Sequence, residues 1–475
     1  MSTALRTLLI RALTILGGVV LLFVVVVAGW YWKKKLHKYP ESTISQAQGE
    51  QLFQSAVFEN HEAEGVPYWI WKVMPEMFPQ SFKPEYAELG FIRVAGRDLP
   101  LGMNKSRRFG IEWVTHNCAL CHAAAYRATE TAEQTVVMGM PNAFFRRQIY
   151  VEGLDKAYMS DAFTPDAVLT AIEKKTTLPA AERPVYREWV GKLRERAIDY
   201  KNHVGTTRDW HPLHAPGQAE GFGAAKQYAG VFDETIGTAD FPSTFMQRPR
   251  VIGHWDGIST STLERVIGSA LAIGAKGSAI DMQQMLDIDK YTMDLKPPPY
   301  PLTVDTPKAQ RGGAVFQREC ANCHAAGGAR INTIVPLTEV KTDPHRQKSL
   351  YVSFLWRIKL GTLPSNYPFQ HWQSSDGYRS DFLEGLFTRG PYLHNGSVPS
   401  IRDLLKPAAE RPKKFMRGTN VLDAANLGYR SDAAAPGNVF EYDTSREGYS
   451  NAGHEYGTAL PEAQKDELVE YLKTL

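Results

Sequence analysis

All four cysteines of the 475-residue chain fall in two copies of one short pattern, C-x-x-C-H. The first copy holds Cys118, Cys121 and His122, and the second holds Cys320, Cys323 and His324. This spacing is typical of covalent haem attachment. Two sulfurs can form thioethers with the vinyl groups of one porphyrin, and the adjacent imidazole can ligate the iron. The sequence therefore predicts two covalently bound haem c groups, with His122 and His324 as proximal iron ligands.

Other uses of the paired cysteines explain less of the pattern. Four cysteines could form two disulfides, or one Cys₄ zinc site whose ligand pairs share the C-x-x-C spacing. Both alternatives leave the histidine after each pair without a role. A thioredoxin-like redox pair needs a strand–helix setting, which the sequence around either motif does not indicate.

Composition and charge describe an ordinary globular chain. Hydrophobic residues make up 43% and charged residues 22%, and the formal net charge is only +3. That charge is too small for the dense basic face that nucleic acid requires, so we expect no nucleic-acid partner. Aromatic residues, at 11%, fit burial of a large flat group, although ordinary core packing explains them as well.

The first 32 residues predict a membrane anchor. No charged residue occurs between Ala12 and Trp32, a stretch that would span roughly 31 Å as a helix. Aromatic residues at 30–32 suit a membrane interface. A cleaved signal peptide is the rival, with Val26 and Ala28 as a small-residue cleavage site. The apolar run is longer than such peptides usually carry, which favours an uncleaved anchor.

The orientation signals disagree. Lysines at 33–35 and 38 follow the apolar run and favour a cytoplasmic body. Haem c is attached on the outer side of the bacterial inner membrane, and we give this the greater weight. The expected location is the bacterial inner membrane, single-pass, with the body in the periplasm.

The remaining chain indicates a mainly α protein. Helical patterns are expected near 44–57, 184–200, 262–275 and 306–324, and in a C-terminal helix after Pro461. The prolines of "KPPPYP" at 296–301 exclude a helix and indicate a linker. We therefore predict an anchor at 1–32, an N-terminal haem domain with loop-rich extensions at 33–300, and a C-terminal cytochrome c-like domain at 301–475.

Several longer motifs resemble the bacterial di-haem cytochrome c peroxidase superfamily, and within it the branch containing the haem-dependent rubber oxygenases. The matching stretches include "GRDLPLGM" (96–103), "GHWDG" (253–257), "RGGAVFQRECANCH" (311–324), "RGPYLHNGSVPSIRDLL" (389–405) and "NAGHEYGT" (451–458). The resemblance implies two cytochrome c-like domains with facing haems. It also implies that Trp255 lies between the haems and relays electrons; the competing interpretation is a buried core tryptophan. A calcium ion between the halves is compatible with the resemblance, with no ligands assigned.

The resemblance also suggests which side chain completes each iron. For the C-terminal haem it implies His454 as distal ligand, ahead of Met416 and His394. For the N-terminal haem, His116, His211, His214 and His254 are available, but none has the context of a clear ligand. An open distal position binds peroxide or dioxygen, whereas a filled one suits electron transfer. We therefore expect chemistry at the N-terminal haem and electron entry at the C-terminal one.

One departure from the peroxidase pattern matters. Those peroxidases carry a glutamate about twenty residues after the tryptophan of "WDG", and it serves acid–base work on peroxide. Here that region, "GSALAIGAKGSAI", holds no carboxylate before Asp281, and Glu264 is a doubtful substitute because its helix position suits solvent exposure.

The sequence favours a peroxidase-like di-haem oxidoreductase that takes electrons from a small redox protein or a quinol-linked donor. The alternatives are an oxygenase acting on an apolar substrate with dioxygen, and a di-haem electron carrier without enzymatic activity.

Overall fold

The computed structural model describes residues 3–36, 41–57, 65–208, 213–221, 235–273, 275, 280–350, 355, 367, 369–437 and 439–475. Its helices are α1 (Thr3–Leu36), α2 (Gln46–Ser55), α3 (Tyr68–Met77), α4 (Ala119–His122), α5 (Arg147–Met159), α6 (Pro165–Glu173), α7 (Arg183–Arg208), α9 (Thr262–Ala272), α10 (Met282–Asp294), α11 (Thr306–Glu319), α12 (Ala321–His324), α13 (Leu337–Val340), α14 (His345–Lys348), α16 (Ile401–Leu404) and α17 (Glu462–Leu472). Three short 3₁₀ helices are η1 (Pro84–Tyr86), η2 (Leu386–Thr388) and η3 (Ala408–Glu410). The helices expected near 44–57, 184–200, 262–275 and 306–324 and at the C-terminus are thus confirmed as α2, α7, α9, α11 with α12, and α17.

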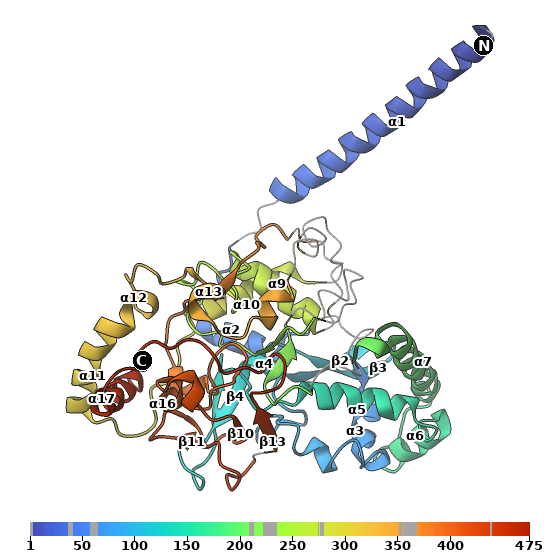
Figure 1. Cartoon of the computed structure of the whole chain (residues 1–475). Helices are drawn as coiled ribbons and strands as arrows, with labels where there is room; N and C mark the ends of the chain where they lie inside the picture. Colours follow the sequence, from blue (N-terminus) through green and yellow to red (C-terminus); the bar gives the residue numbers. More distant parts are fainter. Residues whose placement is uncertain are drawn as a thin grey trace.

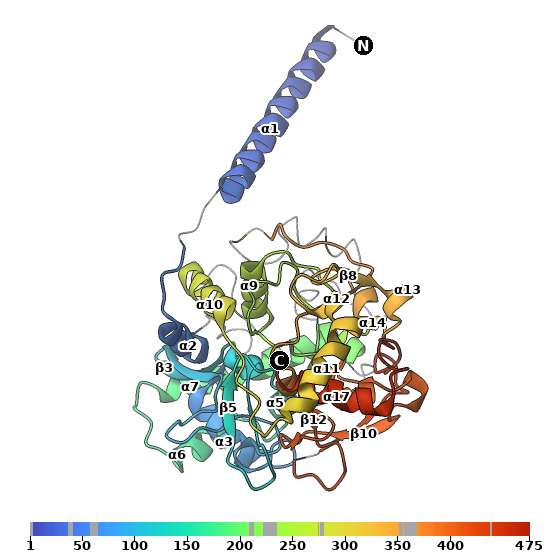
Figure 2. The ribbon, with the colours of Figure 1, turned by 90° about the vertical axis from the view of Figure 1, so that its left-hand side faces the viewer.

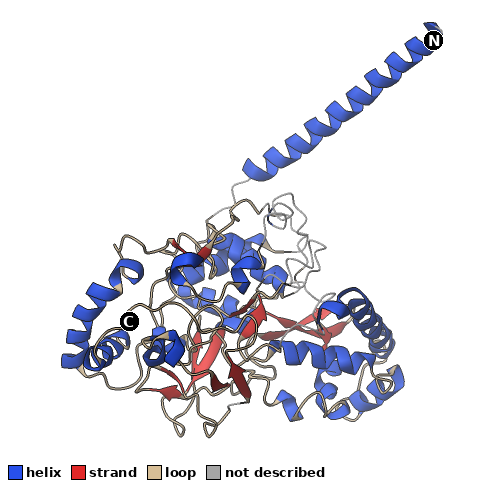
Figure 3. Cartoon of the chain, viewed as in Figure 1, coloured by secondary structure: helices blue, strands red, loops and turns tan. Residues whose placement is uncertain are grey.

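The strands are short and scattered along the chain. They are β1 (Val66–Pro67), β2 (Met103–Arg108), β3 (Ile111–His116), β4 (Ala123–Tyr126), β5 (Thr135–Met138), β6 (Gln218–Glu220), β7 (Thr238–Asp240), β8 (Ile334–Pro336), β9 (Gly377–Arg379), β10 (Lys414–Arg417), β11 (Leu422–Asp423), β12 (Gly428–Tyr429) and β13 (Phe440–Asp443). One three-stranded sheet has the order β1-β3-β2, and the other described sheets are antiparallel pairs: β4-β5, β6-β7, β8-β9, β10-β13 and β11-β12. Figure 3 shows these strands between the helices of the body.

The expected fold, a mainly α protein of two cytochrome c-like domains behind a transmembrane helix, is therefore wrong. The sheets contradict the mainly α description, and two cytochrome c domains do not separate in the packing. One buried cluster joins Tyr126 and Phe245 to Phe316 and Leu472, from opposite sides of the proline-rich segment. A second joins Phe53 and α9 to Trp372. Short strands escape pattern reasoning because their stability comes from pairing with distant segments rather than from local propensity.

The hairpin of β2 and β3 is a local case that pattern reasoning could have found. Residues 103–108 and 111–116 pair in register around Phe109–Gly110. Both turn residues have positive φ, 50° and 83°, as a two-residue hairpin turn requires. The content of Pro, Gly and aromatic residues at 60–116, without a long period, predicts loops and short helices there, and the hairpin corrects that prediction.

The N-terminal helix α1 extends away from the body in both views (Figures 1 and 2). Among the described residues, no helix combines the length and apolarity needed to cross a bilayer. This overturns the predicted membrane anchor and the inner-membrane location derived from it.

Helices α11 and α17 pack tightly beside the second cysteine motif. The ring centroids of Phe316 and Tyr471 lie 5.1 Å apart across this pair. A Cβ on Gly312 would come within 1.8 Å of the backbone oxygen of Glu467, so a glycine is required at the crossing. This contact connects the chain terminus to the helix that leads into Cys320.

Candidate haem site

Each C-x-x-C-H motif forms a single helical turn, α4 or α12. The His122 amide donates to the Cys118 carbonyl oxygen, and the His324 amide donates to the Cys320 carbonyl oxygen, both at 3.0 Å. Such a turn projects the two thiols and the imidazole from one short segment. After the first motif the chain enters β4, and the Gly139 amide donates to the His122 carbonyl oxygen at 2.7 Å, which secures the end of the turn.

The two proximal histidines are held in the same way. Nδ1 of His122 lies 3.0 Å from the Pro242 carbonyl oxygen, and Nδ1 of His324 lies 2.6 Å from the Asp381 carbonyl oxygen. Because a carbonyl can only accept, Nδ1 is the protonated nitrogen and Nε2 keeps its lone pair. Burial lowers the pKa of His122 to about 4 and also lowers that of His324. Both rings are therefore neutral and oriented as iron ligands.

The cysteines match thioether attachment better than the alternatives. None of the four forms a disulfide. Burial raises the pKa of the Cys118 and Cys320 thiols to about 12 and also raises that of Cys323. The described residues contain no group of three or more His, Cys, Asp or Glu side chains placed to hold a metal ion. Within that part of the chain, the calcium ion that the resemblance allows therefore has no assigned ligands.

Both motifs open into one continuous cavity of about 1090 Å³. Its lining includes Cys118 and His122 from the first motif, Cys320 and His324 from the second, and Trp255 from the central loop. A single small-ligand pocket usually measures ~300–1,000 Å³. The volume and the shared lining fit large prosthetic groups held close to one another.

His454 lies opposite His324. The ring centroids are 6.2 Å apart and the rings are tilted by 43°. Two imidazole–metal bonds of about 2.0 Å leave roughly 1.1 Å for the distance from each nitrogen to its ring centre, so one iron fits between the rings. Burial lowers the pKa of His454 to about 4, and its Nδ1 is buried without a hydrogen-bond partner. The spacing is the one at which His324 and His454 could together hold a single haem iron.

The backbone at His454 is shaped to present this ring. Gly453 and His454 both have positive φ, 76° and 47°. A Cβ on Gly453 would lie 2.3 Å from the carbonyl oxygen of Val340, and the His454 amide donates to that oxygen at 2.7 Å. Strained backbone of this kind persists where surrounding contacts impose it, often at functional sites.

The two rival ligands are engaged elsewhere. Met416 lies in β10, opposite Glu441 of β13, and faces a separate small pocket. His394 is buried and lines the main cavity, but its Nε2 lies 3.0 Å from the Tyr378 hydroxyl and its ring stacks on Tyr378. Their placement leaves His454 as the side chain facing His324.

Opposite His122 the structure brings no comparable ring. His116, His214 and His254 all line the cavity, but no ring pairing with His122 like that of His324 and His454 occurs among the described residues; the ring recorded against His122 is Phe241, at 6.4 Å. His254 instead packs on Trp372, with ring centroids 5.9 Å apart. His211 lies outside the described residues.

Trp255 connects the two proximal sites. Its Nε1 donates to the Asp240 carbonyl oxygen at 2.9 Å, and its carbonyl oxygen accepts from the Arg379 amide at 2.9 Å. Asp240 ends β7, two residues before the Pro242 carbonyl that anchors His122. Arg379 ends β9, two residues before the Asp381 carbonyl that anchors His324. Trp255 therefore lies at the centre of a path of hydrogen bonds and short backbone segments between the two imidazoles.

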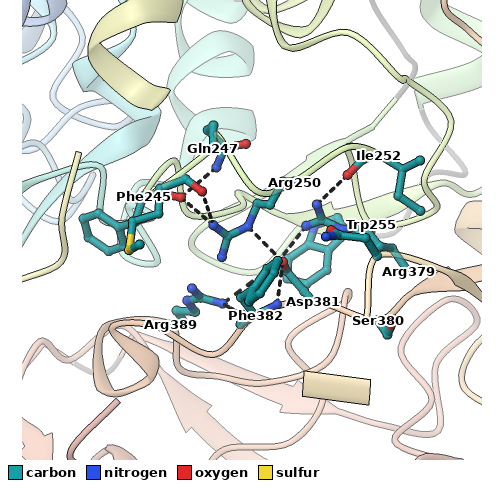
Figure 4. Close-up of polar contacts among 12 residues, drawn as sticks. Phe245, Gln247, Arg250, Ile252, Trp255, Arg379, Ser380, Asp381, Phe382 and Arg389 are labelled. Carbon is teal, nitrogen blue, oxygen red and sulfur yellow. Dashed lines mark hydrogen bonds and ion pairs between the residues drawn. The ribbon is translucent and has the colours of Figure 1, made fainter. Parts of the chain in front are cut away.

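A cluster of buried arginines surrounds Asp381 (Figure 4). Arg250 Nε and Arg379 Nη2 donate to its carboxylate at 2.8 and 2.7 Å, and Arg389 Nη1 lies 3.9 Å away. Burial opposes ionisation of Asp381, but the three guanidinium groups outweigh it and hold its pKa well below the usual range. Nε of Arg379 and Nε of Arg389 are buried without a hydrogen-bond partner. These two donors line the cavity and suit the carboxylates of a porphyrin.

The carboxyl groups of Glu264 and Asp289, on two neighbouring helices, are placed differently from what the sequence suggested. Glu264 is fully buried rather than solvent-exposed, and it accepts hydrogen bonds from the Gln370 amide at 2.7 Å and from the His371 amide. It therefore holds the loop before Trp372. Asp289 of α10 does line the cavity, a placement that we did not predict. It follows Trp255 by more than thirty residues on a second helix, so spacing within the motif could not reveal it.

Taken with the one-turn motifs, these contacts have the features that covalent attachment of haem c requires. A protein-family comparison agrees: residues 377–416 match the family described as "RoxA-like, cytochrome c-like". This segment begins at β9 and includes Asp381, Arg389 and His394. It therefore covers the proximal surroundings of the C-terminal haem, but neither C-x-x-C-H motif.

Two curated relatives come from Sinorhizobium fredii (strain NBRC 101917 / NGR234). "Uncharacterized protein y4iM" is 31% identical over 281 residues, which cover 50% of this chain and 64% of that protein. "Uncharacterized protein y4iJ" is 30% identical over 249 residues, covering 38% of this chain and 41% of that protein. The chain thus spans less than two thirds of the length of these relatives.

Proposed function

We propose that the chain is a di-haem c oxidoreductase in which the two haem sites divide the work. The observation that carries this proposal is an asymmetry between two similar half-sites. Both proximal histidines are anchored by a backbone carbonyl, yet within the described part of the chain only His324 faces a second imidazole. A six-coordinate haem transfers electrons, whereas one with an open position binds an oxidant.

In this proposal His324 and His454 hold the electron-accepting haem, and Cys118, Cys121 and His122 hold the reactive one. The haems supply redox chemistry at their irons; the chain's residues orient them, exclude water and provide the path between them. Trp255 supports electron transfer from the C-terminal to the N-terminal site because it is linked to both proximal loops. The electrons would come from a small redox protein or a quinol-linked donor.

A peroxidase-like reaction is the first candidate. A dioxygen-dependent oxygenase acting on an apolar substrate is the second, and the lining near the first motif favours keeping it. There α9 contributes the apolar side chains Val266 and Ala272, and Phe53 contributes its ring. These side chains would contact an apolar substrate.

Ligand-binding stoichiometry of the purified holoprotein tests the division of labour. We expect two haems per chain and one carbon monoxide bound per reduced chain. A C118A/C121A variant should lose the haem that binds carbon monoxide, whereas C320A/C323A should lose the other. No carbon monoxide binding would favour a plain electron carrier, and two bound molecules would refute the assignment of His454.

Steady-state assays separate the two reactions. Turnover of hydrogen peroxide with a reduced electron donor supports the peroxidase-like reaction, and oxygen uptake with an apolar polyene supports the oxygenase. Trp255→Phe should slow electron transfer between the haems. Trp69→Phe, on α3 and outside the cavity, is the matched control and should leave that rate unchanged.

A further inference from the structure

Asp289 is a carboxyl group in the cavity whose placement no other part of the site explains. It lies on α10 and lines the cavity that also contains Cys118 and His122. Thr262 Oγ1 donates to its Oδ2 at 3.1 Å. Its Oδ1 is buried without a hydrogen-bond partner. A buried, unsatisfied carboxylate oxygen is costly, so this atom calls for an explanation.

The surroundings of Asp289 belong to the N-terminal half-site. Figures 1 and 2 both place α10 beside α9. Residues of these two helices, including Ile267 and Ile288, form a buried cluster against which Cys118 packs. Val266, Ser269 and the neighbouring Ile288 continue the cavity wall around Asp289. The carboxyl therefore lies in the cavity wall formed by the helices on which Cys118 packs, among apolar side chains and the polar Thr262 and Ser269.

The nearby charges do not fix Asp289 as an anion. Arg265 on α9 is its electrostatic neighbour, but that guanidinium donates to Ser261 O, Gln247 Oε1 and Arg250 O. On α2, which also packs against α10, Glu50 acts on Tyr291 instead. Among the described residues Asp289 has no ion-pair partner within 4.0 Å. Burial raises its pKa to about 6, against the opposing effects of Thr262 and Arg265.

Other carboxylates of the cavity contrast with this one. Asp240 is paired with the buried Arg417 at 3.0 Å, and Asp381 is held by arginines. The arginines hold the pKa of Asp381 well below its usual range. Burial raises the pKa of Asp240 although Arg417 opposes the shift, but Asp240 stays bound to that guanidinium. Asp289 differs because it can be protonated or ionised near pH 6 without breaking an ion pair.

We propose that Asp289 is the proton-exchanging residue of the N-terminal half-site, where it serves weakly acidic small molecules of the peroxide class. A molecule HX entering the cavity transfers its proton to the Asp289 carboxylate and is held as X⁻; when X⁻ leaves or accepts electrons, the carboxyl returns the proton. This inference rests on the proposed open position at that half-site. It supplies, from a second helix, the acid–base group that the region after Trp255 lacks.

Cyanide association with the oxidised holoprotein tests the proposal, because hydrogen cyanide must lose its proton on binding. Asp289→Asn should slow association about 10²-fold near pH 7, the usual scale for general base help. In the wild type the hydrogen bond from Thr262 favours the ionised form of Asp289. Thr262→Val removes this bond and should therefore raise the pH midpoint of the association rate. Asp287→Asn is the control on the same helix: that carboxylate accepts from Ser42 Oγ and Gln283 Nε2 and does not line the cavity.

An infrared titration supplies a readout independent of haem reactivity. The wild-type protein should show a carboxyl band that titrates near pH 6 and is missing from Asp289→Asn but present in Asp287→Asn. Association rates in Asp289→Asn equal to those of the wild type would overturn the proposal. If the wild type binds no cyanide, the open half-site fails, and absence of the titrating band would then overturn the role of Asp289 separately.

Discussion

Replacing His454 by alanine should convert one of two haems from six-coordinate to five-coordinate. The His324 and His454 ring centres are 6.2 Å apart, so their midpoint lies about 3.1 Å from each ring centre. That distance equals an imidazole–metal bond of about 2.0 Å plus roughly 1.1 Å of ring. Removing the His454 ring leaves its space beside the iron free for a small ligand.

The expected change in spin state and carbon monoxide binding follows from the proposal that one of two haems per chain loses a ligand. Half of the haem should change from low-spin to high-spin, and carbon monoxide bound per reduced chain should rise from one to two. The assay combines electron paramagnetic resonance of the oxidised protein with carbon monoxide titration of the reduced protein. His394→Ala is the matched control, because His394 is also buried in the cavity but bonds to the Tyr378 hydroxyl.

The result that would refute the reasoning is specific. If His454→Ala keeps the wild-type share of low-spin haem and still binds one carbon monoxide, His454 is not a ligand and the facing rings have another role. A rise in carbon monoxide binding in His394→Ala instead would transfer the assignment to that residue.

Three further outcomes are expected. Burial raises the pKa of Asp289 from 3.8 to about 6, so the folded wild type holds a proton that the unfolded chain releases between about pH 4 and 6. The wild type therefore loses stability as the pH rises from about 4 to 7, and Asp289→Asn should gain up to roughly 3 kcal/mol relative to it. Denaturant unfolding at several pH values measures this difference, and a difference that stays constant with pH contradicts it. Gly453→Ala, whose Cβ would meet Val340 O at 2.3 Å, should displace His454 and reproduce part of its carbon monoxide phenotype; unchanged binding would show that the loop tolerates a side chain. Arg417→Met should destabilise the fold by about 3–5 kcal/mol, since it leaves the Asp240 carboxylate buried without its partner, and a loss under 1 kcal/mol in thermal or chemical unfolding would refute this.

The predictions from sequence patterns were wrong where the structure depends on contacts between segments far apart in the chain. The mainly α, two-domain description failed because pairs such as β8 with β9 join segments some forty residues apart, and no single segment shows the period of a long strand. The membrane anchor was inferred from the apolar run at 12–32, but no helix among the described residues has the length and apolarity needed to cross a bilayer. The role of Glu264 was misjudged because its partners, Gln370 and His371, lie more than a hundred residues away.

The sequence by itself indicated which prosthetic group the chain could bind covalently. Two thiols and an imidazole within five residues are a covalent requirement of haem c, and that requirement is local, so Cys118–His122 and Cys320–His324 could be read directly. The family resemblance suggested that the two copies differ, but only the tertiary structure decided which side chains face each motif. A loop with positive φ, more than a hundred residues downstream, brings His454 opposite His324. The backbone carbonyls that orient both imidazoles, and the helix that brings Asp289 beside the first motif, likewise depend on packing between segments far apart in the chain.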